Sequence, residues 1–341
     1  MRNLIFSLCF IIACSSPKEE HAIVISSQAT VKEVNGVELR CPEQVFWSQG
    51  KLITINNCGD KPVQVVDLQS KSEQWIGSFG DGPDEIGSLA SMVTFDKSNG
   101  VLVKMLDTRK RSIFTLLDND GEIKLTQNRN IPAVIYNWYN FIELRDGSIV
   151  YNNLSGEYNM SRYLPSGDEL FVMDFLPDIG TPNQGVDKAY DYYNHIVAKP
   201  DGSKIVQVLQ SFPFMIAYDA DLNLIEVHQT QESYQKPDFS INGANKFFDL
   251  PQYILEAHAG KDYFYVVNPN ATYEQTANAN FAPSIEIYNW DMELQAILSL
   301  DRLLGFTAID FDQKKIYGLA IGEEELVLAN VDIPRELHKY F

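Results

Sequence analysis

A repeat with a period near fifty residues constrains this 341-residue chain more than any other feature of its sequence. Each unit begins with a strand and continues through a turn into an alternating strand rich in Ile, Val and Tyr. These second strands start near Lys51, Val101, Ser148, Lys204, Asp262 and Lys315. Six copies of one small unit predict a repeat architecture, in which each unit buries its apolar faces against its neighbours.

The second unit predicts four short strands in each repeat. Its segments 92–96, 101–107, 112–117 and 122–125 alternate with turns such as KSNG and DNDG. The sixth unit lacks a fourth strand, which a segment near Ala29–Val34 would supply. We therefore expect an all-β, six-bladed β-propeller of four-stranded antiparallel blades, closed by an N-terminal strand. A pair of β-sandwiches is the competing architecture, but it would not need the regular spacing.

The N-terminus has the features of an export signal. Arg2 precedes an apolar run from Leu4 to Ala13 that is too short to span a bilayer, and Cys14 follows it. This order resembles the bacterial lipobox, which implies cleavage before Cys14 and acylation of that residue. The predicted divisions are a signal peptide at 1–13, a lipidated tether at 14–28 and a propeller at 29–341. A buried first strand or an ordinary secretory signal is the alternative.

The tether residues carry two further resemblances. Ser15 resembles the sorting residue of outer-membrane lipoproteins, and the charged run 18–20 resembles a short signal for export to the cell surface. That run also fits a merely solubilising role. We expect a lipid-anchored outer-membrane protein on the periplasmic or the surface side.

Two cysteines are expected to pair. The segment from Cys41 to Cys58 predicts a hairpin that turns at Gln49-Gly50, so that Ser48 faces Lys51 and the two cysteines lie opposite each other. An exported protein meets the oxidising conditions that a disulfide requires. Two buried thiols are the alternative, because Gln is not an ideal residue for such a turn.

The amino-acid composition excludes some classes of binding partner. The net charge of −19 and the pI near 4.6 argue against nucleic acid and against electrostatic docking on anionic lipid. A hydrophobic content of 45% is enough for a packed core, and after Cys14 no apolar run approaches the length of a membrane span.

One segment carries a resemblance to a known family. The stretch WIGSFGDGPDEI at 75–86 and the blade after it resemble the TolB-like six-bladed propeller lipoproteins of the bacterial envelope. This resemblance implies the propeller fold and a place in the envelope. It brings no established activity and no catalytic residues.

The long connections are expected to gather on one face of the ring, which is the usual binding face of a repeat array. They are 80–88, 131–140, 177–192, 231–252 and 268–283. Their aromatic residues suit stacking on sugars or anchoring a protein partner, and the ligand-binding candidates are Tyr136, Trp138, Tyr139, Tyr190, Tyr192 and Tyr193. The alternative is that these rings pack between blades or plug the mouth of the channel.

Asp81, Asp84 and Glu85 could hold Ca²⁺, since carboxylates suit that ion, although the segment lacks the alternation of a calcium loop. Solvated acids around an inter-blade turn are the alternative. No histidine pair has metal-ligand spacing, and no catalytic motif appears. His195 and His258 open corresponding first strands near the axis, where a hydrogen-bonded core histidine is the simpler interpretation.

Two functions remain. The first is a non-enzymatic binding or scaffolding lipoprotein for an envelope protein or a glycan, without a catalytic residue or a required cofactor. The second is a metal-dependent hydrolase or lyase similar to the calcium-dependent propeller lactonases, with three or four inward ligands at the axial mouth.

Overall fold

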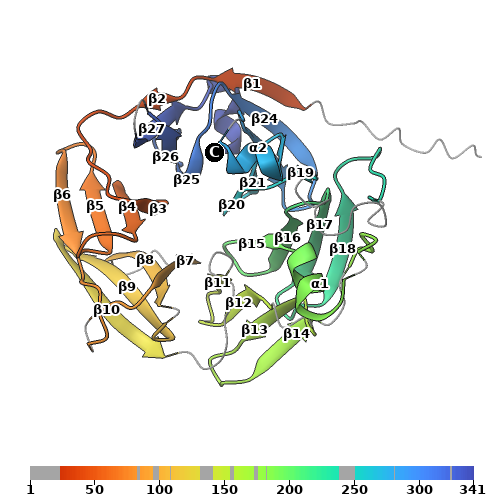
Figure 1. Cartoon of the computed structure of the whole chain (residues 1–341), viewed down its shortest axis with the longest axis horizontal. Coiled ribbons are helices and arrows are strands. Elements are labelled where there is room, and N and C mark those ends of the chain that lie inside the picture. The colour runs from red at the N-terminus through yellow and green to blue at the C-terminus, as the bar shows by residue number, and fades with distance from the viewer. Residues whose placement is uncertain are drawn as a thin grey trace, which may run out of the picture.

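The computed structural model describes residues 24–82, 85–94, 100–107, 109–130, 141–153, 157–172, 176–181, 183–237, 250–279, 281–322 and 325–341. Its strands form six blades around a central axis, as Figure 1 shows. The predicted all-β, six-bladed propeller is confirmed. Among the described residues, no helix is long and apolar enough to cross a membrane.

The first three blades follow the predicted spacing of about fifty residues. Blade one has β3 (Pro42–Ser48), β4 (Lys51–Asn56), β5 (Val63–Asp67) and β6 (Ser72–Ile76). Blade two has β7 (Leu89–Thr94), β8 (Val101–Asp107), β9 (Ser112–Asn119) and β10 (Glu122–Asn130). Blade three has β11 (Phe141–Glu143), β12 (Ile149–Asn152), β13 (Met160–Tyr163) and β14 (Glu169–Val172).

The last three blades repeat the pattern. Blade four has β15 (Asn194–Ala198), β16 (Lys204–Leu209), β17 (Phe214–Asp219) and β18 (Leu224–Gln229). Blade five has β20 (Glu256–Ala259), β21 (Tyr263–Asn268), β23 (Ser284–Asn289) and β24 (Leu294–Leu300). Blade six has β25 (Gly305–Asp310), β26 (Lys315–Ile321) and β27 (Leu326–Asp332).

The N-terminal segment closes the ring with two strands. β2 (Lys32–Glu33) pairs antiparallel with β27 and supplies the predicted fourth strand of blade six. β1 (Ile25–Ala29) lies parallel to β24, with Ile25 opposite Ala296 and Ala29 opposite Leu300, and so adds a fifth strand to blade five. The same segment therefore joins blades five and six, and both strands lie along the outside of the ring in Figure 1.

The core lies between the blades. Six clusters of buried apolar side chains correspond to the six interfaces of a closed ring, from the contact of blades one and two to that of blades six and one. The second strand of each blade is packed on both faces, which explains its almost continuous apolar sequence. In β16, for example, every residue after Lys204 is buried.

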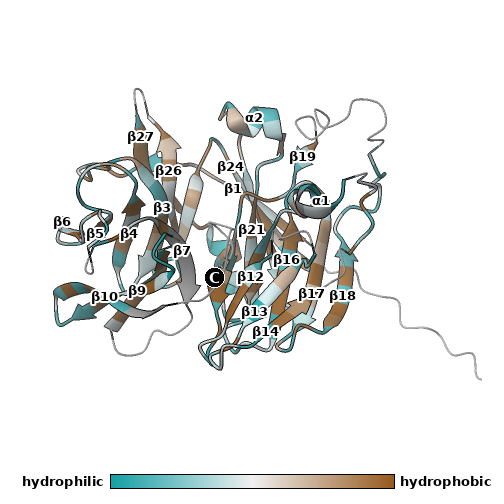
Figure 2. Ribbon diagram, turned by 60° about the horizontal axis from the view of Figure 1, so that its bottom comes forward, coloured by the Kyte–Doolittle hydropathy of each residue, from teal (hydrophilic) through white to brown (hydrophobic). Residues whose placement is uncertain are grey.

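The two faces of the ring differ. The turn face carries the hairpin turns between first and second strands and between third and fourth strands. The loop face carries the other connections, and they contain α1 (Gly185–Asp191), α2 (Tyr273–Ala277), β19 (Pro251–Gln252) and β22 (Ala271–Thr272). In Figure 2, α2 and β19 lie on the side of the ring where β26 ends and β27 begins. The segment after β27 ends in a 3-10 helix, Arg335–Tyr340, on the turn face.

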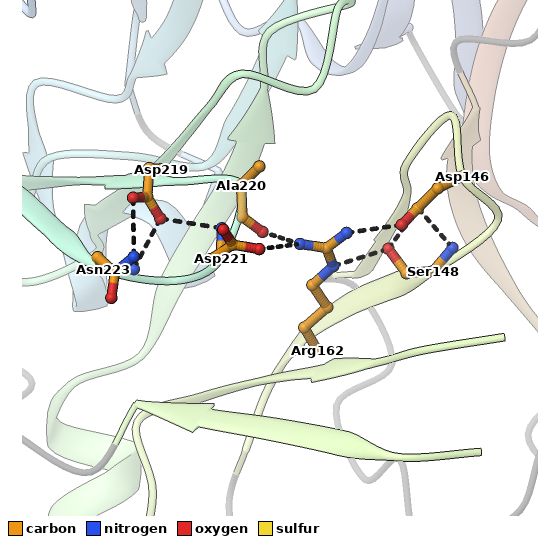
Figure 3. A network of polar contacts seen from close by, with 7 residues as sticks. All are labelled: Asp146, Ser148, Arg162, Asp219, Ala220, Asp221 and Asn223. Atoms are coloured by element: carbon orange, nitrogen blue, oxygen red, sulfur yellow. Dashed lines mark hydrogen bonds and ion pairs between the residues drawn. The ribbon is translucent and has the colours of Figure 1, made fainter. Parts of the chain in front are cut away.

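Arg162 joins blades three and four at the turn face. Its side chain is only 8% exposed and donates to Asp146 Oδ2 at 2.7 Å and to Ser148 Oγ at 2.9 Å. The same guanidinium donates to the carbonyl of Ala220 and lies 3.8 Å from Asp221 Oδ1 in the next blade. Figure 3 shows how the two turns converge on this one side chain. A single buried cation thus connects neighbouring repeats.

The predicted disulfide between Cys41 and Cys58 is present, with Cα atoms 5.8 Å apart. The hairpin turns at Gln49 and Gly50, which both have positive φ, and Ser48 faces Lys51 as expected. The expected register fails near the cysteines, because a β-bulge after Pro42 shifts the pairing by one residue. The cysteines are therefore bridged beside the bulge rather than in a regular opposed pair. The bond indicates an extracytoplasmic location.

Candidate functional site

A cavity of about 1220 Å³ lies along the axis, between the inner strands β3, β15, β20 and β25. At the loop face it reaches Thr276 of α2 and the neighbouring Phe281, and at the turn face it reaches Gln49 and Pro200. The C-terminal Phe341 packs at the turn-face end, where its ring stacks on Tyr265 at 4.8 Å. The cavity is larger than the pockets that hold most small ligands, which are roughly 300–1,000 Å³.

Three polar side chains form a hydrogen-bonded chain in the loop-face half of the cavity. Glu256 Oε2 accepts hydrogen bonds from the backbone N–H of Thr307 at 2.5 Å and from its hydroxyl at 2.8 Å. The hydroxyl hydrogen of Thr307 is thereby used, so its oxygen accepts from His258 Nε2 at 2.8 Å. His258 Nε2 also lies 3.4 Å from Glu256 Oε2. This chain fixes the orientation of all three groups.

The electrostatic state of this chain follows from its contacts. Burial alone would raise the pKa of Glu256, but the contacts with His258 and Thr307 outweigh burial and lower the pKa. The carboxyl group is therefore ionised at neutral pH. It is an acceptor, and its hydrogen bonds spread part of the negative charge over its neighbours.

His195 lies one blade away and is held neutral. Burial lowers the pKa of His195 to about 4, even though the charge of Glu256 opposes that change. Its ring meets Tyr193 edge to face at a centroid distance of 6.0 Å, and both residues line the cavity. At neutral pH the His195 imidazole thus brings no positive charge to the site.

Phe306 is the exposed aromatic residue at the mouth. It is the second residue of β25, it lines the cavity, and it is 42% exposed. Its φ of 50° lies in the left-handed region, where a bulky residue is strained, and a bulge between Gly305 and Ala308 interrupts the pairing of β25. The same bulge aims the backbone N–H of Thr307 at Glu256. One local irregularity therefore sets both a ring and a carboxylate at the loop-face mouth.

The structure separates the three predicted tyrosines of 177–193. Tyr190 on α1 is 57% exposed, whereas Tyr192 is buried in the core between blades three and four and donates to the carbonyl of Pro177. Tyr193 lines the axial cavity. The segment thus contributes one surface ring, one core ring and one cavity ring, not a single binding patch. The other three aromatic candidates, Tyr136, Trp138 and Tyr139, lie outside the described residues, as do Cys14 and Asp84.

The two described acids of the GDGPDE segment have protein partners. Asp81 pairs with Arg109 at 2.9 Å on the surface, and Glu85 Oε2 accepts from the backbone N–H of Gly82 at 2.7 Å. The ammonium group of Lys110 donates to the carbonyl oxygens of Gly82 and Glu85. A lysine therefore binds the loop carbonyls to which a calcium ion would be attracted. Within the described ranges, no three His, Cys, Asp or Glu side chains gather to hold a metal ion.

Sequence reasoning missed Glu256, Thr307 and Phe306. Glu256 and His258 are two residues apart on one strand, so they point to the same side of it, and this spacing was a usable signal. Thr307 is 51 residues beyond Glu256, close to one repeat, and therefore lies in the neighbouring blade. The bulge at Phe306 has no signal in the sequence beyond the preceding glycine.

No family model matches the chain, and no curated protein matches it. Its fold is similar to that of a DUF4221 family member from Bacteroides vulgatus, with a TM-score of 0.57, 12% identity and coverage of 93% of this chain and 98% of that one. A Bacteroides fragilis protein, provisionally described as exported, gives a TM-score of 0.56 at 11% identity and covers 92% of this chain and 100% of its own. A luciferin-regenerating enzyme gives 0.50 at 8% identity, with coverages of 90% and 96%. At these identities the likeness shows the propeller fold alone.

Proposed function

We propose that this protein is an envelope lipoprotein of the TolB-like propeller kind, anchored through Cys14 to the outer membrane. The order of charge, apolar run, small residue and Cys in residues 1–14 supports the anchor. The Cys41–Cys58 disulfide and the similarity to a protein described as exported agree with it. Several acyl chains on one residue would hold the protein stably on a membrane.

The anchor is tested in cells that express the full chain. Radiolabelled palmitate should be incorporated into the wild type and not into a Cys14→Ser variant, and only the wild type should fractionate with the outer membrane. Equal labelling of both variants would contradict lipidation at Cys14.

We further propose that the protein acts by binding, without chemistry of its own, and that the axial cavity receives a glycan or a segment of a protein partner. The cavity of about 1220 Å³ with oriented polar groups at its loop-face half carries this proposal. A concave site with a few oriented polar groups is the usual form of a ligand pocket. No observation among the described residues favours the metal-dependent hydrolase or lyase.

The binding function is tested with a glycan array and a peptide library on the full chain in detergent. A ligand that binds should protect cavity residues such as Tyr193 and Phe281 from a carbene footprinting reagent. It should leave Phe171, an exposed residue on the outer strand β14, unprotected. A panel in which nothing binds, or a footprint on the outer strands alone, would contradict an axial binding site.

A further inference from the structure

The loop-face half of the axial cavity has the chemistry of a sugar-binding subsite, and we propose that it takes a neutral glycan. In this subsite the ring of Phe306 stacks on a pyranose face, and the carboxylate of Glu256 accepts its hydroxyl groups. The inference rests on the proposed binding function and deepens it by naming the ligand class.

Phe306 would supply the apolar platform of the subsite. An apolar ring that is 42% exposed costs free energy in water, and this one is held in a strained backbone conformation at the mouth of a cavity. Strain of this kind persists where surrounding structure enforces it, and it gathers at binding sites. An apolar ligand face laid against the ring would remove that surface from water.

Glu256 would supply the hydrogen-bond acceptor of the subsite. Its Oε2 is occupied by both donors of Thr307, so the carboxylate is rigid before a ligand arrives. A rigid acceptor loses little conformational entropy when a ligand hydroxyl binds to it. Thr307 is also the residue that follows Phe306 in the chain, so the ring and the carboxylate are positioned by the same bulge. This combination fits a pyranose sugar, whose apolar ring face can stack on Phe306 while its hydroxyl groups donate to Glu256.

The charges around the subsite favour a neutral ligand. The two lysines among the described residues that line the cavity, Lys261 and Lys339, belong to the turn face. His195 is neutral, and His258, the basic side chain beside Glu256, already contacts that carboxylate and bonds to Thr307, so neither histidine offers an uncommitted cation to the carboxylate of a uronic acid. Glu256 is itself hydrogen-bonded to Thr307 and contacts His258, so it does not require an ammonium partner. A ligand that is neutral and rich in hydroxyl groups fits best.

The experiment is isothermal titration calorimetry on the full chain in detergent, with hexasaccharides of three kinds. These are neutral ones built from glucose, xylose, mannose or galactose, an anionic hexagalacturonate, and a cationic glucosamine hexamer. At least one neutral hexasaccharide should bind, and at least tenfold more tightly than the two charged ones. A charged hexasaccharide that binds as tightly as every neutral one would overturn the inference.

The variants separate the subsite from the rest of the cavity. Phe306→Leu keeps an apolar side chain but loses the ring, and Glu256→Gln keeps an acceptor for Thr307 but loses the charge. Each should weaken binding of the neutral hexasaccharide about tenfold. Phe171→Ala is the matched control, because Phe171 is 41% exposed on an outer strand, and it should leave the affinity unchanged. Thermal melting of each variant shows that it is folded.

Two outcomes distinguish this inference from the broader one. If peptides bind with a cavity footprint and no sugar does, the glycan inference fails while the binding function stands. If a neutral sugar binds equally well to the wild type and to both variants, the subsite is wrong although the ligand class is right, and the proposal as stated is overturned.

Discussion

Removal of the disulfide gives the most quantitative test of the fold. The bond joins residues 17 positions apart, and it limits the conformations of the unfolded chain. In the chain-entropy model, closing a loop of this size contributes about 3 kcal/mol to the free energy of unfolding at 25 °C. Because the entropy of unfolding is about 2.1 cal/mol/K per residue, that loss should lower the Tm of a propeller of about 320 residues by roughly 4–5 °C.

The assay is thermal unfolding of the wild type and of a Cys41→Ala/Cys58→Ala double variant, each with and without a reductant. The reductant should lower the Tm of the wild type toward that of the double variant and should not change the double variant. A double variant that melts with the wild type would refute the loop-entropy argument. A double variant that loses far more would show that the bridge also holds the bulge beside Pro42.

Three further predictions address single features. Arg162→Met should lower the free energy of unfolding, measured by urea titration, by about 2 kcal/mol. This loss is smaller than for a fully buried ion pair because the carboxylate of Asp146 is half exposed. Arg145→Met, on the exposed neighbouring turn, should change the free energy of unfolding little, and equal effects of the two substitutions would contradict an inter-blade role for Arg162. The pKa of His195 is lowered to about 4 in the folded protein, from 6.5 in the unfolded chain. As the pH falls below 6.5, the unfolded chain therefore takes up the proton first. The free energy of unfolding should fall by up to about 3 kcal/mol between pH 6.5 and pH 4. A His195→Asn variant should lose that part of the pH dependence in urea titrations, and an unchanged slope would disprove it. Deleting β1 should speed amide hydrogen exchange in β24 and leave the outer strands of other blades unchanged, and uniform exchange would show that β1 is not a local cover.

Much of the ring could be predicted from the sequence, because each second strand is apolar on both faces and is bounded by turn residues. Lys204–Leu209 is one such strand, and its start was predicted to the residue. The strand that completes blade six was also predicted, since a repeat with a missing strand has to be completed by another part of the chain. These inferences depend on local pattern and on a period, both of which a single sequence contains.

The features that could not be predicted from the sequence are small local departures from that pattern. β1 was missed because ISSQA has little apolar alternation and is stabilised mainly by pairing with β24. The bulges beside Pro42 and at Phe306 each shift the pairing away from the regular ladder without a distinctive residue type. The site at Glu256 and Thr307 combines two blades, so it becomes visible only when the repeat is closed into a ring.

The direction of β1 has a consequence for how the molecule would face its surroundings. β24 runs from the turn face to the loop face, and because β1 is parallel to it, β1 begins with Ile25 at the turn-face edge of blade five. Cys14, the proposed site of lipid attachment, is eleven residues before Ile25 in the sequence, and eleven residues span at most about 40 Å when fully extended. A tether of this length would place the lipid within about 40 Å of the turn-face edge of blade five, whereas Phe306 and Glu256 lie at the opposite, loop-face end of the cavity. If the proposed anchor and binding site are both correct, a ligand could reach the loop face without passing between the ring and the membrane.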